Sequence, residues 1–273
     1  MADSARAFVP GHVTGFFSAH PDDDPTKAGS RGAGIAIDDG VVVRLEPGEG
    51  LELNGDAATI EAVDRVLDAL RATASVVVET DLPLGAGFGV SGAAALGTAL
   101  ATNAVFDRGL SENELVTVAH GAEVQAGTGL GDVVAQARGG VPIRLEPGAP
   151  AHGAMDGVPN RQSIEYVSFG EVSTESVIGG DTEELTAAGN RALSALVADP
   201  TLETLMESSR RFAREAELLT PRVEEAIRDV SAAGGEASMA MLGETVFALG
   251  DGLSEAGYEA DACTVSLTGA HVR

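Results

Sequence analysis

Four closely spaced glycines indicate where this chain could hold a phosphate group. Gly85, Gly87, Gly89 and Gly92 lie between a strand-like run, residues 75–80, and an alanine-rich run typical of a helix. Glycine lets backbone amides approach an anion closely, and the N-terminus of a helix adds a partial positive charge. The segment is therefore predicted to bind phosphate.

Two carboxylates and one hydroxyl could supply the remaining chemistry. Ser91 stands at the mouth of the predicted helix, where its hydroxyl could cap the helix or bind a nucleotide-bound Mg²⁺. Glu123 and Asp132 flank a glycine-rich break; one acid of such a pair can hold Mg²⁺ while the other faces an acceptor hydroxyl. The same spacing also fits two surface carboxylates, or a helix cap in the case of Asp132, so these interpretations stay open.

The glycine segment excludes some nucleotide-binding motifs. No Gly-Lys-Ser/Thr follows it, and the one lysine, Lys27, lies far away, so neither a Walker loop nor a protein-kinase lysine is present. Residues 87–92 do satisfy the dinucleotide pattern Gly-x-Gly-x-x-Gly. That fold needs another strand after the helix, whereas a capping box at residues 111–114 predicts a second helix. Two alternatives to a phosphate-binding segment therefore stay open. The chain could be an NAD(P)-binding oxidoreductase, or the glycines could form a purely structural turn.

The wider pattern predicts an α+β protein, with a loop at residues 146–159 and a helix announced by Thr220 and Pro221. Strands are predicted over residues 7–9, 34–37, 41–45, 51–53, 75–80, 140–145, 164–169, 238–241, 245–249 and 263–267. Helices are predicted over residues 59–74, from 92 to about 106, 111–125, 133–138, 182–197, 202–219, 222–232 and 251–256.

The charge balance is strongly acidic. Among 273 residues, 42 Asp and Glu face 17 Lys and Arg, a net charge of −25, so neither nucleic acid nor a membrane is an expected partner. Acid excess with a single lysine is typical of a cytoplasm near molar salt, where the Debye length is about 3 Å; an ordinary acidic protein is the alternative. A single cysteine, Cys263, excludes an internal disulfide, and no signal peptide is recognisable, so a cytoplasmic location is expected.

Three segments, in order, resemble the motifs of the GHMP kinases, a family of small-molecule kinases. Residues 83–94, PLGAGFGVSGAA, resemble the ATP-binding motif of that family, and residues 5–12, ARAFVPGH, resemble its first motif. Residues 123–132, followed by two glycines, resemble the acidic segment with a metal-binding Glu and a catalytic Asp. Val90 replaces the first of the usual paired serines, so only Ser91 can supply the hydroxyl contact.

The resemblance implies a two-lobed fold with ATP and Mg²⁺ as cofactors. A ribosomal S5-like half, residues 1–168, would bind nucleotide, and a ferredoxin-like half, residues 169–273, would complete the site. Asp132 would be the catalytic residue, and Ser91 and Glu123 would hold the metal. The residues expected to bind nucleotide are Pro83, Gly85, Ala86, Gly87, Phe88, Gly89, Val90, Ser91 and Gly92.

The resemblance also implies an acceptor. Residues 8–17, 29–34 and 238–243 are similar to the archaeal branch of the family that phosphorylates the hydroxy acid pantoate on the route to coenzyme A. Shikimate, homoserine and mevalonate stay as alternative acceptors, and the oligomeric state is left open between a monomer and a homodimer.

A carboxylate substrate needs cationic partners in so acidic a protein. Arg6, His12 and Arg31 are the candidates for substrate binding. A surface ion pair is the alternative for each arginine, and a hydrogen bond that fixes the loop is the alternative for His12.

Overall fold

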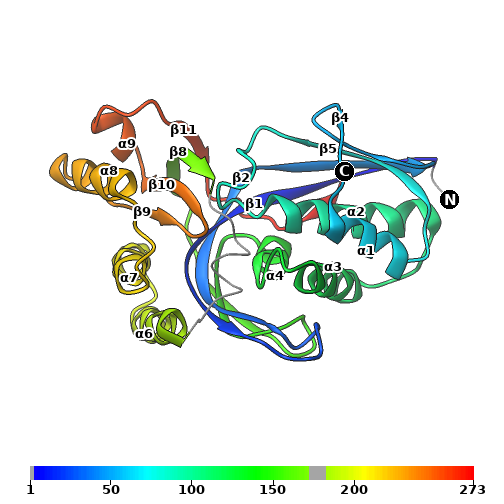
Figure 1. The fold of residues 1–273 in the computed structure, drawn as a ribbon, viewed down its shortest axis with the longest axis horizontal. Helices are drawn as coiled ribbons and strands as arrows, with labels where there is room; N and C mark the ends of the chain where they lie inside the picture. Colours follow the sequence, from blue (N-terminus) through cyan, green and yellow to red (C-terminus); the bar gives the residue numbers. More distant parts are fainter. Residues whose placement is uncertain (1–2, 172–182) are drawn as a thin grey trace.

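Two long N-terminal strands form the spine of the structure. In the computed structural model, which describes residues 3–171 and 183–273, β1 (Ala5–His20) pairs antiparallel with β2 (Gly29–Pro47). The pair crosses the molecule and curves down to a hairpin (Figure 1). Most of its residues are buried because both faces of this curved ribbon are covered.

Within the described residues these strands belong to an eight-stranded sheet, ordered β12-β1-β2-β5-β3-β4, with β6 added to β2 and β7 added to β6. The further strands are β3 (Leu51–Leu53), β4 (Asp56–Ala57), β5 (Ala74–Thr80), β6 (Val141–Glu146), β7 (Ala154–Val158) and β12 (His271–Val272). The prediction of an unbroken loop over 146–159 is wrong at β7, whose mixed sequence AMDGV carries no alternating apolar pattern.

Four helices pack beside this sheet: α1 (Glu61–Ala69), α2 (Val90–Phe106), α3 (Glu112–Ala126) and α4 (Asp132–Arg138). The alanine-rich α2 is buried along nearly its whole length. Its small side chains let it approach β2 closely, since a Cβ at Gly97 would lie 2.5 Å from a methyl carbon of Val43. The predicted capping box of α3 is confirmed: Ser111 Oγ accepts from the backbone of Glu114, and the Glu114 carboxylate accepts from the backbone of Ser111.

A second, four-stranded antiparallel sheet has the order β11-β8-β10-β9. Its strands are β8 (Ser163–Glu171), β9 (Ala237–Ala240), β10 (Gly243–Leu249) and β11 (Asp261–Thr264). Around it lie α6 (Glu183–Ala198), α7 (Leu202–Glu215), α8 (Pro221–Ala232) and α9 (Gly252–Glu255), on the opposite side of the molecule from α1–α4 (Figure 1). Thr220 caps α8 and Pro221 is its first residue, as predicted, whereas the predicted first residue of α6, at 182, lies outside the described residues.

The expected border between the two halves, after residue 168, falls inside β8. Every partner of β8 belongs to the second sheet, so we propose that the second lobe begins before Ser163. The two lobes share one apolar cluster, in which Phe16 and Phe17 of β1 pack with residues of α6–α8 and the second sheet. None of the helices in residues 3–171 and 183–273 combines the length and apolar character that crossing a bilayer requires.

Candidate active site

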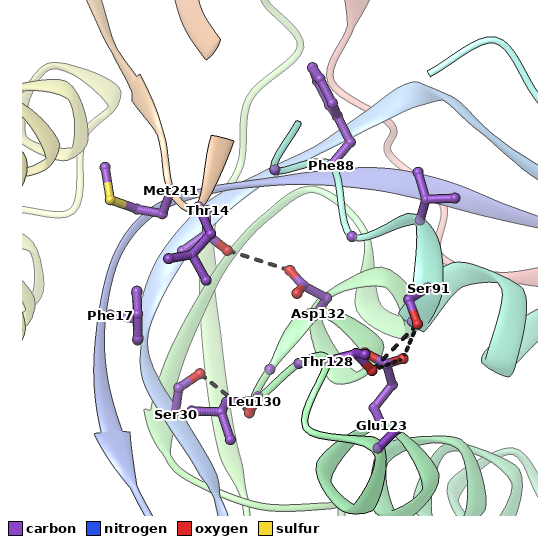
Figure 2. A pocket seen from close by; sticks show the side chains of 18 of the residues that line it. Thr14, Phe17, Ser30, Phe88, Ser91, Glu123, Thr128, Leu130, Asp132 and Met241 are labelled. Atoms are coloured by element: carbon purple, nitrogen blue, oxygen red, sulfur yellow. Dashed lines mark hydrogen bonds between the residues drawn. The ribbon is translucent and has the colours of Figure 1, made fainter. Parts of the chain in front are cut away.

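A cavity of about 450 Å³ opens between the two lobes (Figure 2). Residues 85–92 are called here the glycine loop, and all of them except Ala86 line the cavity. The rest of the wall includes the connection from α3 to α4, and Met241 and Leu242 at the turn between β9 and β10. The residues with the strongest predicted chemistry, Ser91, Glu123 and Asp132, all line this one cavity.

Backbone geometry explains the glycines of the loop. Gly85, Gly87 and Gly89 have φ between 64° and 90°, a region that side chains disfavour. A Cβ at Gly87 would also lie 2.9 Å from the Met241 carbonyl oxygen, and one at Gly243 would lie 2.0 Å from that of Ala86. The turn between β9 and β10 therefore presses directly on the glycine loop.

The loop ends at the N-terminus of α2. Gly89 is the N-cap residue, and no side chain caps the helix, so the first amide groups of α2 are left to another acceptor. Of the residues predicted to bind nucleotide, all but two line the cavity. Pro83 and Ala86 do not.

Ser91 does not cap α2. Its hydroxyl donates a 2.5 Å hydrogen bond to Glu123 Oε1, and the hydroxyl of Thr128 donates to the same oxygen at 2.9 Å. The Glu123 side chain is buried, and burial raises its pKa to about 7 despite the two hydroxyl donors. The carboxyl group thus lies beside two hydroxyl oxygens in a buried part of the cavity wall (Figure 2).

Asp132 is the first residue of α4 and does not cap that helix. Its Oδ1 accepts a 2.7 Å hydrogen bond from Nδ1 of His12, and Thr14 lies at 3.5 Å. Burial alone would raise the pKa of Asp132, but the His12 contact and the Arg144 charge outweigh it and hold that pKa below its usual range. The carboxylate is therefore ionised and 26% exposed toward the cavity.

The two carboxylates border the same small space. A Cβ at Gly129 would lie 2.5 Å from Glu123 Oε2 and 3.6 Å from Asp132 Oδ2. Glycine at this position keeps open a gap that both acids face.

Arg144, which the sequence reasoning missed, is the cation of the site. It lies in β6, lines the cavity with Ser30 and Asp132, and is only 2% exposed. Its Nε and Nη1 have no hydrogen-bond partner among the described residues. Gly131 makes room for it, because a Cβ there would lie 2.6 Å from the Arg144 Nε. A lone arginine inside an apolar strand was the signal that could have found it.

The three side chains that were predicted to bind substrate, Arg6, His12 and Arg31, lie outside the cavity lining. Arg6 is exposed on β1 opposite Arg44, and Arg31 donates through Nε to the Leu145 carbonyl at 2.7 Å. His12 is fully buried behind Asp132, which matches the alternative of a fixing hydrogen bond. None of the three lines the cavity.

Comparisons with known proteins agree with this geometry. The family model "GHMP kinases N terminal domain" matches residues 57–140, which include the glycine loop and both acids. The pantoate kinase of Methanocaldococcus jannaschii is 36% identical over 89% of this chain and 91% of its own length. That of Thermococcus kodakarensis is 34% identical over 89% and 87%.

Solved structures of kinases and of a related phosphotransferase share this fold. A "phosphotransferase related to CoA biosynthesis pathway" superposes with a TM-score of 0.87 at 30% identity, covering 99% of this chain and 98% of that one. The homoserine kinase of Cytophaga hutchinsonii, at 19% identity, shares the fold with a TM-score of 0.70 over 100% and 98%.

The chain therefore belongs to the GHMP kinase family, and it is a small-molecule kinase with the two-lobed α+β fold of that family. Within the family, three relatives that match 89% of this chain at 33–36% identity are pantoate kinases. The oxidoreductase alternative is wrong: α2 leads into α3 and α4, and the next strand, β6, runs antiparallel to β2 instead of extending a parallel sheet.

Proposed function

We propose that this protein transfers the γ-phosphoryl group of ATP to the primary hydroxyl of pantoate, giving 4-phosphopantoate for an archaeal route to coenzyme A. The names of the relatives support the acceptor. The observation that carries the proposal is the buried guanidinium of Arg144, whose Nε and Nη1 find no partner in residues 3–171 and 183–273, beside the Asp132 carboxylate. A hydroxy acid offers what both groups need, a carboxylate for one and a hydroxyl for the other.

The glycine loop and the uncapped start of α2 would receive the phosphates of ATP. Positive φ angles at three loop glycines keep the backbone bare, so amide groups can reach the anion. The partial charge of the α2 N-terminus adds to this attraction.

Mg²⁺ fits the oxygen donors of the site. Ser91 and Glu123 would hold it, and when bound it would neutralise charge on the transferring phosphoryl group. The described residues contain no cluster of three or more His, Cys, Asp or Glu that could hold a metal alone. The pair Ser91 and Glu123 suits Mg²⁺, which proteins usually hold by one or two carboxylates together with substrate phosphates.

Asp132 is proposed to receive the proton of the pantoate hydroxyl. As the hydroxyl oxygen bonds to the γ-phosphorus, the bond from that phosphorus to the bridging oxygen of ADP breaks, and the proton passes to Asp132. Arg144 orients the acceptor by its carboxylate, so that the hydroxyl lies in line. Asp132→Asn should therefore lower kcat by about 10²-fold or more with little change in the KM for ATP; near-normal turnover would remove this role.

A coupled ADP-release assay tests the acceptor. In molar KCl, pantoate should give by far the highest kcat/KM among pantoate, shikimate, homoserine and mevalonate. A clear preference for another acceptor, or ADP release that no acceptor stimulates, contradicts the proposal.

The acidic composition supports a proposal about the salt concentration in which the protein works. We propose that the protein works in the cytoplasm at high salt, because a net charge of −25 is tolerated best where screening is strong. Unfolding on withdrawal of salt is the expected result, and full stability in dilute buffer would contradict it.

A further inference from the structure

Gln136 is a buried polar residue that none of the steps above uses. It lies in α4, four residues after Asp132, so both side chains are on the same side of the helix. Its side chain is fully buried, and its Nε2 donates a 2.9 Å hydrogen bond to the carbonyl oxygen of Gly89. Its Oε1 has no partner in the part of the chain that the structure describes.

The carbonyl that Gln136 holds belongs to the residue where the glycine loop becomes α2. Gly89 has φ 64° and ψ 33°, and its carbonyl also accepts from the backbone of Ala93 at 3.0 Å. The preceding carbonyl, of Phe88, accepts from the backbone of His12 at 3.0 Å. Two consecutive carbonyls are thus tied to two different elements, one to α4 and one to β1.

The glycine loop packs closely against α4, with no space for a side chain at Gly89 or Gly92. A Cβ at Gly89 would lie 3.0 Å from Asp132 and 3.0 Å from Gln136 Nε2. A Cβ at Gly92 would lie 3.3 Å from Gln136 Oε1. A shift of the loop toward α4 would therefore displace Gln136, Asp132 or both.

We infer that Gln136 is a positioning residue that fixes the glycine loop, and with it the nucleotide phosphates, relative to the Asp132 carboxylate. This inference rests on the proposed binding of ATP at the loop. Since in-line transfer depends on sub-ångström placement, loss of the tie should weaken ATP binding and slow transfer together. Pantoate binding should be spared, because the contact that would hold its carboxylate is Arg144 in β6, whereas the Gln136 side chain bonds to the carbonyl of Gly89.

Two substitutions separate the hydrogen bond of the Gln136 amide from the space that the side chain fills. Gln136→Met keeps the length and fills the space but cannot donate to Gly89. Gln136→Glu keeps the shape, yet an ionised carboxylate there would face the Gly89 carbonyl and stand near Asp132. Thr102→Val is the matched control, because Thr102 is a buried residue of α2 whose hydroxyl has no partner among the described residues.

The experiment measures nucleotide affinity in the absence of pantoate by calorimetry, together with kcat, both KM values and the melting temperature. We expect Gln136→Met to weaken ATP binding about three- to tenfold and to lower kcat, with the KM for pantoate within twofold of wild type. Gln136→Glu should weaken ATP binding more, and Thr102→Val should not change it.

Unchanged ATP affinity and kcat in a folded Gln136→Met overturn the inference, as does a change confined to the melting temperature. If neither Gln136 variant folds, the residue is structural and the inference is overturned as well. Failure of the proposed function looks different, because the wild type itself would then show no ATP binding or no pantoate-dependent ADP release.

Discussion

The Nδ1 atom of His12 lies 2.7 Å from Oδ1 of Asp132, inside the protein and behind the face that Asp132 turns to the cavity. Burial lowers the pKa of His12 more than the Asp132 contact raises it, so the imidazole is neutral and donates from Nδ1. The histidine therefore orients the proposed base without contributing a formal charge.

Removal of this imidazole should affect turnover more than binding. We expect His12→Ala to lower kcat by about tenfold to a hundredfold, because the carboxylate loses the bond that fixes it, while both KM values change little. His12→Asn, which keeps an amide donor, should recover part of the loss. Steady-state kinetics of both variants check this, and a rise in the KM for pantoate alone would instead place His12 on the substrate.

Arg144 should strengthen pantoate binding but should not stabilise the free protein. Arg144→Met should raise the KM for pantoate by about tenfold to a hundredfold, since a charge-assisted contact of about 1.5–3 kcal/mol is lost, with little effect on the KM for ATP. The variant should also melt no lower than wild type, because two nitrogens of the buried guanidinium lack partners in the part of the chain that the structure describes.

A neutral acceptor provides the control for Arg144. Pantoamide, in which an amide replaces the carboxylate, should be a far poorer substrate than pantoate for wild type but not for Arg144→Met. Equal discrimination by both enzymes would remove Arg144 from carboxylate recognition.

Glu123 should make the stability of the free protein depend on pH. Burial raises its pKa from 4.5 to about 7, so between these values the folded state binds more protons than the unfolded state. The free energy of unfolding should therefore be highest below pH 4.5, as far as this group is concerned, and should fall by up to about 3 kcal/mol as pH rises through 7.

Denaturant titrations with a chelator present, across this pH range, check the Glu123 prediction. Glu123→Gln should remove this part of the pH dependence, because the amide does not titrate. A variant with the same pH profile as wild type would show that another group is responsible.

Loss of the Ser91 hydroxyl should raise the Mg²⁺ concentration that the enzyme needs. Ser91→Ala should raise the Mg²⁺ concentration for half-maximal activity about tenfold, since one of the two proposed protein ligands is lost, and Ser91→Thr should restore much of it. Titration of Mg²⁺ at saturating ATP measures this. An unchanged Mg²⁺ requirement in Ser91→Ala would mean that its hydroxyl serves only Glu123.

Local patterns marked Ser91, Glu123 and Asp132 as candidates, because glycine-rich segments adjoin all three, and the resemblance to the GHMP kinase motifs joined them into one predicted site. Local patterns were not enough for Arg144. Its place depends on the pairing of β6 with β2, where Gly32 faces Arg144 across more than a hundred residues of chain. For the same reason, the location of His12 behind the cavity was visible only after β1 had been placed in its sheet.

The contact between Gly87 and the turn that ends at Gly243 means that the proposed triphosphate site is assembled from distant parts of one polypeptide. A truncated chain that stops after β7 would keep every residue of the glycine loop but would lack the surface on which that loop rests. Retention of the whole sequence motif in a shortened gene product is therefore no guarantee of a working kinase, and any dissection of this enzyme must keep both ends of the chain together.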